Sequence, residues 1–323
     1  MVGTQRKASR QAVGQIMQIL AQEMAVPVAP EVTLFVEQML GAVRPLGVLF
    51  YGSGLRSGID ADTLLDFYII VNRQSDWPRS ALACMANAVL PPNVEYQELK
   101  VAGRAMRAKI AILTLGQLRA LTGFATLNTT VWARFSQPVR LVWHNHAQAA
   151  QAITHCIARA NVTAARWAAL LGPEQAPPVA FWNGLYARTY KAELRVENGQ
   201  RSSGLVEANQ ERYVQLLLPC WQAGGIPFAH EGEDVAPLLS AEQKHKARHQ
   251  WLLRARLGRP LNILRLIKAV YTFRGSARYA AWKVRRHSGI EIALSPFAEK
   301  HPLLAAPPVL WKLWRQGAFR QGA

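Results

Sequence analysis

Two short apolar runs joined through a glycine-containing turn constrain the fold more than any other feature of the sequence. The first run, Leu46–Tyr51, ends at Gly52-Ser53-Gly54, and the second run, Asp66–Asn72, begins with a carboxylate. Short apolar runs bounded by turn residues are typical of buried β-strands. The sequence therefore predicts a strand that leads into a Gly-Ser turn, followed by a second strand that opens with Asp66.

Strand and helix patterns are mixed in the first half of the chain. Further strands are expected at Val94–Val101, Ala108–Thr114 and Val139–Trp143, with a basic turn at Gly103–Arg107. Helices are expected near the N-terminus, at Pro30–Ala42 and at Ala147–Leu171. This mixture indicates an α/β or α+β domain up to about residue 150, and we predict the α+β class.

We expect three regions along the chain, at 1–150, 151–240 and 241–323. The second region is predicted to be mainly helical, with a loop at Gly224–Ala236. In the third region, Gly258-Arg259-Pro260 is expected to end one helix, Ala241–Leu257, before a strongly amphipathic second helix at Leu261–Phe273.

Composition excludes several classes of protein. Half of the 323 residues are hydrophobic, which is enough to build a core and argues against global disorder. No apolar run reaches the roughly 18 residues that a membrane-spanning helix needs.

The three cysteines are widely spaced and fit neither a disulfide scaffold nor a CxxC metal site, which indicates a reducing compartment. The first 20 residues lack the apolar core of a signal peptide.

The net charge of +18 is concentrated near the C-terminus. Residues 241–323 contain 17 Lys and Arg against 3 Asp and Glu, a net charge of +14, so the rest of the chain carries only +4. A region this basic is expected to meet an anionic partner, such as nucleic acid or anionic lipid.

The Gly-Ser turn and Asp66 suit the binding of a nucleoside triphosphate. Glycines allow the backbone to approach a phosphate closely, and turn N–H groups and the Ser53 hydroxyl donate to its oxygens. A carboxylate on the neighbouring strand can hold Mg²⁺ together with the phosphates. A Gly-Ser-Gly tripeptide alone is more often a plain turn, so the prediction depends on its spacing from Asp66.

This arrangement resembles the nucleotidyltransferase superfamily typified by polymerase beta. That superfamily usually has Asp-x-Asp on its second strand, whereas Leu64 stands in the first of these places here. Asp60 and Asp62 in the preceding loop are alternative ligands or simply solvated loop acids.

Further segments resemble the mitochondrial translocator assembly and maintenance family of phosphatidate cytidylyltransferases. In chain order, these segments are Tyr51-Gly52-Ser53-Gly54, Leu65-Asp66-Phe67, Asp76-Trp77, Val94-Glu95-Tyr96, Arg107-Ala108-Lys109-Ile110, Trp132–Val139 and Tyr190–Arg195. The resemblance covers roughly residues 45–215. It departs from the family pattern at Ala192 and Glu193, where the family has Gly and Asp.

The resemblance implies a Mg²⁺-dependent enzyme that makes CDP-diacylglycerol from CTP and phosphatidic acid at a membrane surface. It also implies a nucleotidyltransferase domain at 1–150, a winged-helix-like domain at 151–240 and a membrane-docking region at 241–323. Asp66 is then the metal ligand, with Gly52, Ser53, Gly54 and Lys109 binding the triphosphate.

Other candidate residues are more open to alternatives. Lys109 lies in an apolar strand and needs either an anionic partner or a path to water. Arg195 is a candidate phosphate ligand, and Tyr190 and Glu193 are possible substrate contacts; exposed helix positions are the alternative. Glu98 is a possible further metal ligand, and Arg104 and Arg107 are expected to be solvated.

The C-terminal region pairs its cations with tryptophans. Arg278, Lys283 and Arg285 are interleaved with Tyr279 and Trp282, and Pro308–Arg315 contains two further tryptophans. Tryptophan prefers the membrane interface, so we favour an anionic membrane surface over nucleic acid as the partner.

We therefore expect a peripheral phosphatidate cytidylyltransferase at the cytoplasmic face of the inner or plasma membrane, or at the matrix side in a mitochondrion. The alternatives are a nucleotidyltransferase with another acceptor, and a non-catalytic basic protein that binds lipid or nucleic acid.

Overall fold

A computed structural model describes residues 2–56, 58–60, 63–192, 200–288, 291 and 294–300 of the chain. It contains helices and strands in an α+β arrangement, which confirms the predicted fold class at that level. Two compact units are present, and each is built from two separate stretches of sequence. The first unit comprises residues 1–27 and 114–264, and the second comprises 28–113 with the chain after 264.

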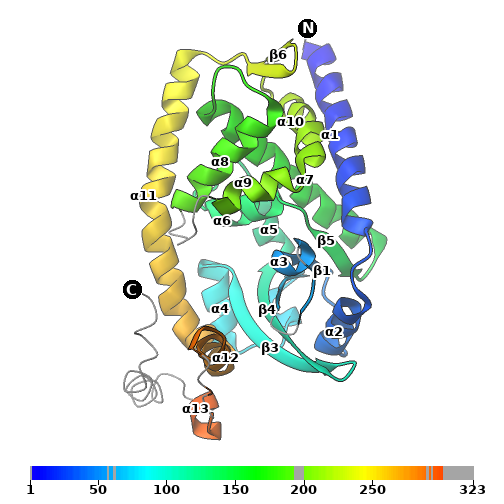
Figure 1. The fold of residues 1–323 in the computed structure, drawn as a ribbon, viewed down its shortest axis with the longest axis vertical. Helices are drawn as coiled ribbons and strands as arrows, with labels where there is room; N and C mark the ends of the chain where they lie inside the picture. The colour runs from blue at the N-terminus through cyan, green and yellow to red at the C-terminus, as the bar shows by residue number, and fades with distance from the viewer. Residues whose placement is uncertain are drawn as a thin grey trace. The chain divides into compact units, whose positions relative to one another are not determined.

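The second unit contains four adjacent strands in the spatial order β3-β4-β2-β1; Figure 1 labels β1, β3 and β4. These are β1 (Gly47–Tyr51), β2 (Leu64–Val71), β3 (Asn93–Val101) and β4 (Arg104–Thr114). Strand β1 pairs antiparallel with β2, as does β3 with β4. The four strands expected from the sequence in this region are therefore confirmed.

Two strands begin earlier than the apolar pattern indicates. Asp66 is the third residue of β2 rather than its first, because the strand already starts at Leu64. Most of the expected basic turn belongs to β4, and the chain reverses at Ala102-Gly103, where both residues have positive φ. In β4 the first residues are exposed, and in β2 Asp66 separates Leu64 and Leu65 from the longer apolar run, so apolar periodicity hides both boundaries.

One face of these strands is covered by α2 (Pro30–Leu40), as its apolar stripe predicts. Phe35 on α2 stacks on Phe67 of β2 with ring centroids 5.8 Å apart. Side chains of a strand alternate between its two faces, so Asp66 points away from α2. Asp66 lies opposite Tyr51 in the register with β1.

The end of α11 (Ala241–Thr272), with α12 (Ser276–Ser288) and α13 (Pro296–Lys300), belongs to this second unit. The backbone of Arg274 forms a short parallel bridge with Glu95 on β3, and the Tyr96 N–H donates to the Arg274 carbonyl at 2.9 Å. Gly275 follows with φ of +81°, and a Cβ there would lie 2.4 Å from the Tyr96 carbonyl oxygen. Only glycine allows α12 to start this close to β3.

The first unit is mainly helical. Its core contains fully buried aromatic side chains from several helices, among them Trp132, Trp167, Trp182, Trp221, Tyr186 and Tyr213. Its elements are α1 (Val2–Ala25), α5 (Leu115–Leu121), α6 (Thr129–Phe135), β5 (Arg140–His144), α7 (Ala147–Leu171), α8 (Pro178–Ala192), α9 (Gln200–Glu207), α10 (Gln210–Ala223), β6 (Phe228–Glu231), β7 (Asp234–Pro237) and the start of α11.

Two expectations for this unit are wrong. The expected loop at Gly224–Ala236 contains a β-hairpin, β6–β7, which turns at Gly232 with φ of +67°. Helix α11 also continues through Pro260 without the expected stop. Gly258 packs so closely on α8 that a Cβ would lie 2.9 Å from the Ala192 carbonyl oxygen, so this glycine serves helix packing rather than helix termination.

The expected boundaries near residues 150 and 240 follow sequence order, whereas the two compact units are interleaved along the chain. The division into domains at residues 150 and 240 therefore stays a prediction. In the part of the chain that the structure describes, no single helix is long and apolar enough to cross a membrane. Helices α1 and α2 reach the length and apolar composition of a membrane span only when they are taken together, as a bent pair.

Candidate active site

The Gly-Ser turn lies directly beside Asp66. Gly52 follows β1 with φ of +93°, a conformation that favours glycine. A Cβ at Gly52 would lie 2.8 Å from Oδ2 of Asp66, so the turn and the carboxylate approach each other more closely than any side chain would allow. The sequence prediction that these residues form one site is consistent with this geometry.

The rest of the turn has two different environments. Ser53 is exposed and begins the short helix α3 (Ser53–Arg56). Gly54 is buried, and a Cβ there would contact Phe50, Thr63 and Leu65 at 3.3 to 3.4 Å. Gly54 therefore serves packing between the turn and the strands, while Ser53 presents its hydroxyl to solvent.

Strands β3 and β4 present charged side chains on one face of the second unit. Lys109 lies opposite Tyr96, and Arg107 lies opposite Glu98, so the four side chains share a face. Lys109 is half-buried. Arg107 is buried rather than solvated as expected, and its guanidinium donates to Glu98 at 3.1 Å. Glu98 also accepts from the Tyr96 hydroxyl at 3.2 Å.

Helix α12 packs over this same face. Tyr279 on α12 contacts the Tyr96 ring, with centroids 5.6 Å apart. Burial raises the pKa of the Tyr279 hydroxyl, and the negative charge of Asp66 raises it further. Tyr279 therefore lies near both Tyr96, which is paired with Lys109, and the charge of Asp66. Asp66 and Lys109 accordingly lie on one face of the sheet, the face against which α12 packs. We call this surface the Asp66 face.

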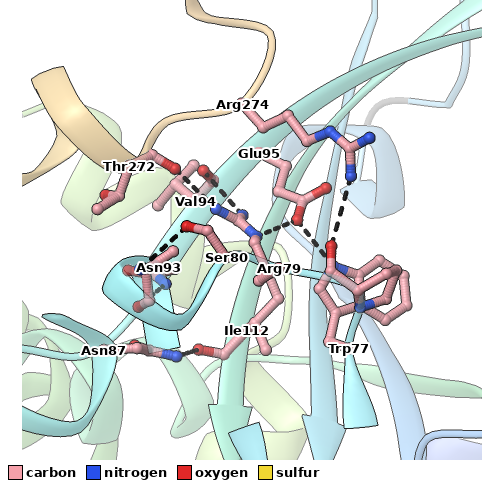
Figure 2. Close-up of polar contacts among 12 residues, drawn as sticks. Trp77, Arg79, Ser80, Asn87, Asn93, Val94, Glu95, Ile112, Thr272 and Arg274 are labelled. Carbon is pink, nitrogen blue, oxygen red and sulfur yellow. Dashed lines mark hydrogen bonds and ion pairs between the residues drawn. The ribbon is translucent and has the colours of Figure 1, made fainter. Parts of the chain in front are cut away.

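A buried ion pair supports β3 from its other side (Figure 2). Arg79 and Glu95 form a salt bridge whose two side chains are only 6% and 1% exposed. The indole N–H of Trp77 donates to Glu95 Oε1 at 2.7 Å. Burial lowers the pKa of Arg79, and the negative charge of Glu95 opposes that shift. On β3, the Glu95 carboxylate is therefore paired on the face opposite to Glu98.

Arg79 and Lys268 attach the end of α11 to the same unit. Figure 2 shows the Arg79 guanidinium reaching the Thr272 carbonyl, at 2.7 Å. Lys268 donates to the carbonyl oxygens of Leu90 and Pro92, both at 2.6 Å. Burial, with the nearby cations Arg265 and Arg79, lowers the pKa of Lys268 to about 8. These contacts hold the chain just before α12 and so fix where α12 begins.

The remaining predicted site residues lie in the first unit, in a loop, or outside the described residues. Tyr190 is half-buried on α8 and belongs to the first unit. Glu193, Arg195 and Asp62 lie outside the described residues, as does the Pro308–Arg315 segment. Asp60 accepts from the Thr63 hydroxyl at 2.6 Å, as a loop-capping residue does.

The chemistry of Asp66 is compatible with a magnesium site only if phosphate oxygens supply most of the ligands. No group of three or more His, Cys, Asp and Glu side chains among the described residues could hold a metal ion. Magnesium in nucleotide sites is held by one or two carboxylates with phosphate oxygens and water, and Asp66 beside the Gly52 turn supplies one such carboxylate. Glu98 is engaged with Arg107 and Tyr96, which makes it a poorer ligand.

Sequence reasoning missed the contribution of α12 to this face. Tyr279 and its arginine neighbours appeared only as part of a basic, aromatic segment, because nothing in the sequence shows that residue 275 returns to β3. It also gave no role to Glu95. The available signal was the position of Glu95 between Val94 and Tyr96 in an expected strand, where a carboxylate needs a partner if it is buried.

Comparison with known proteins adds no family to these observations. A scan against models of protein families finds no match, and a search of curated proteins finds no similar sequence. The fold and the site define an α+β protein with a glycine turn, a carboxylate and cations gathered on one face of a sheet. The resemblance to phosphatidate cytidylyltransferases therefore depends on the sequence motifs alone.

Proposed function

We propose that the protein is a phosphatidate cytidylyltransferase, which transfers the cytidylyl group of CTP to phosphatidic acid. The observation that carries this proposal is the close approach of Gly52 to Asp66 on the face that also bears Lys109. Backbone N–H groups, a carboxylate and a cation are the three kinds of group that a metal-bound triphosphate needs. The finer fold, polymerase-beta-like with a winged-helix-like part, belongs to the same proposal.

In this reaction, a phosphate oxygen of phosphatidate attacks the α-phosphorus of CTP. The new P–O bond forms as the bond to the β-phosphate breaks, and pyrophosphate leaves. The 52–54 turn and the Ser53 hydroxyl hold the β- and γ-phosphates, and Lys109 neutralises their charge. Asp66 would hold Mg²⁺, which supplies charge stabilisation at the reacting phosphate when bound.

The acceptor phosphate is already ionised at neutral pH, so the reaction needs little help from a general base. Positioning of the two phosphates and neutralisation of charge are then the main requirements. A site with one carboxylate, in which Leu64 replaces the usual first aspartate, meets these requirements. This argument favours a phosphate acceptor over an alcohol, whose hydroxyl would have to lose a proton.

The surface of α11 supports a lipid substrate. In the second unit, Arg265 and Lys268 turn inward and donate to the carbonyls of residues 90–92, while Leu266, Ile267 and Tyr271 are 69, 53 and 73% exposed. This orientation is the reverse of that in an ordinary surface helix. An outward apolar strip within a region of net charge +14 suits an anionic membrane surface. We place the enzyme at the cytoplasmic face of that membrane.

The experiment is an assay for CDP-diacylglycerol with CTP, Mg²⁺ and phosphatidic acid in mixed micelles. We expect activity from the wild-type protein and a loss of at least about 100-fold in Asp66→Asn, since a metal-ligating charge is removed. Glu37→Gln is the matched control, because Glu37 is exposed on α2, which covers the opposite face.

Two results would contradict the proposal. Absence of product from the wild-type protein would exclude the assigned substrates. Unchanged activity of Asp66→Asn would remove the Asp66 face from the reaction. Formation of a cytidylylated product from a different acceptor would favour a nucleotidyltransferase of another specificity.

A further inference from the structure

A cavity of about 380 Å³ lies between α12 and the charged ends of β3 and β4, within the second unit. Arg107 and Glu98 line it from the strands, and Arg278, Trp282 and Arg285 line it from α12. Glu291 and Leu294 also line it, from the segment that follows α12. Three guanidinium groups from two distant parts of the sequence therefore face one space.

The charge of this cavity favours an anion. Three arginines face two carboxylates, and Glu98 already accepts hydrogen bonds from Arg107 and Tyr96. Arg285 Nη1 lies 3.7 Å from Glu291 Oε1, and the two side chains are 41% and 80% exposed, so solvent weakens this pair. The buried indole N–H of Trp282 has no hydrogen-bond partner among the described residues. A guanidinium group can donate two parallel hydrogen bonds to the oxygens of one phosphate, and the indole N–H of Trp282 is a further donor.

The cavity adjoins the candidate active site. Arg107 and Lys109 are two residues apart on β4 and point to the same face, which separates their Cα atoms by about 7 Å. Tyr279, one residue after Arg278, lies close enough to Asp66 for the carboxylate charge to raise its pKa. A phosphate in the cavity is therefore next to a triphosphate held by Lys109 and the Gly52 turn.

We propose that this cavity binds the phosphate monoester of the acceptor, with Arg107, Arg278 and Arg285 as its ligands. The inference rests on the proposed function and deepens it, because it assigns the acceptor subsite to α12. The basic C-terminal region then has a role beyond attraction to a membrane. The bridge between Arg274 and Glu95 and the close contact at Gly275 fix α12 for this purpose.

The test is a kinetic comparison of Arg278→Gln, Arg285→Gln and their double variant with a short-chain, water-soluble phosphatidic acid. We expect the KM for this acceptor to rise roughly tenfold or more per arginine, as befits a charged hydrogen bond, while the KM for CTP changes less than about twofold. Lys283→Gln is the matched control. It removes the same charge from an exposed position of α12 that does not line the cavity.

Equal effects of Lys283→Gln and Arg285→Gln would overturn the inference, since general charge would then explain both. An equal rise in the KM for CTP would also overturn it, because the cavity would then hold the nucleotide. Arg285→Lys keeps the charge without the planar fork and should fall between the wild type and Arg285→Gln. Circular dichroism and thermal unfolding establish that each variant is folded.

Titration calorimetry separates this inference from the proposed function. Glycerol 3-phosphate should bind to the wild-type protein and not to the double variant, whereas a glycerol phosphodiester should bind to neither. Equal binding of inorganic phosphate would assign the subsite to free phosphate and overturn the acceptor role. If the wild type makes no CDP-diacylglycerol but binds the monoester through these arginines, the proposed function fails and the cavity assignment stands. No binding of the monoester to the wild type overturns the cavity.

Discussion

Gly52 shows how a single residue can control the candidate site. Its φ of +93° disfavours any other residue, and its Cα lies against the Asp66 carboxylate. Gly58 has a similar φ of +80°, but nothing lies within 4 Å of the position of its missing Cβ. The two glycines share the backbone requirement and differ in the close approach.

We expect Gly52→Ala to abolish nucleotide binding, because its methyl group would displace the Asp66 carboxylate. The free energy of unfolding should fall by about 1 to 3 kcal/mol from the strained φ and the contact together. Gly58→Ala should lower it by about 1 kcal/mol and leave CTP binding intact. Calorimetric titration with CTP and thermal unfolding of both variants measure the difference. Equal loss of CTP binding in both variants would contradict the role of the close approach.

At the residue scale, the sequence allowed the turn and its carboxylate to be predicted, because Gly-Ser and an acid bounded by apolar strands are local signals. It did not allow the partners of Glu98 and Arg107 to be predicted. Their contact depends on the register of β3 with β4. A slip of one residue would place the Glu98 and Arg107 side chains on opposite faces of the sheet.

Strand β3 is the element on which both sides of the second unit depend. On one side Glu95 meets Arg79 and Trp77, and on the other Tyr96 meets α12. Arg79 also reaches the carbonyl of Thr272, so the ion pair links β3 to the end of α11.

We expect Glu95→Ala to lower the free energy of unfolding by about 3 to 5 kcal/mol, because it leaves Arg79 buried without its charge partner. Urea unfolding followed by tryptophan fluorescence measures this change. Breaking the exposed Arg285–Glu291 pair by Glu291→Gln should cost less than about 1 kcal/mol and serves as the control. A loss below about 1 kcal/mol in Glu95→Ala would contradict the importance of the buried pair.

Most elements follow from periodicity, and the exceptions have a common cause. The Ala147–Leu171 helix has the predicted bounds, and the four strands of the second unit are present, although β2 and β4 begin earlier than predicted. The continuation of α11 through Pro260 and the β6–β7 hairpin were not predicted, because a glycine that indicates a break or a loop has another structural role in each. Gly258 allows a close helix contact, and Gly232 allows a tight turn between strands.

At the scale of the whole molecule, the proposed function requires the protein to bind the surface that contains its lipid substrate. We expect the double variant Leu266→Ser, Ile267→Ser to bind anionic phosphatidylglycerol vesicles roughly tenfold or more weakly than wild type, since two exposed apolar side chains no longer enter the interface. Vesicle sedimentation measures this binding. Leu34→Ser, at a 46% exposed position of α2, is the control. Undiminished binding of the double variant would show that this strip does not contact lipid.

The division of the second unit into residues 28–113 and the chain after 264 has a consequence for protein synthesis. The strands that carry Asp66 and Lys109 leave the ribosome early, but α12 leaves it only after the whole first unit has been made. Until then, the Asp66 face lacks α12, and the proposed acceptor cavity has only the wall that β3 and β4 supply. A chain released before residue 276 would therefore display the proposed triphosphate-binding groups without the proposed means of selecting an acceptor.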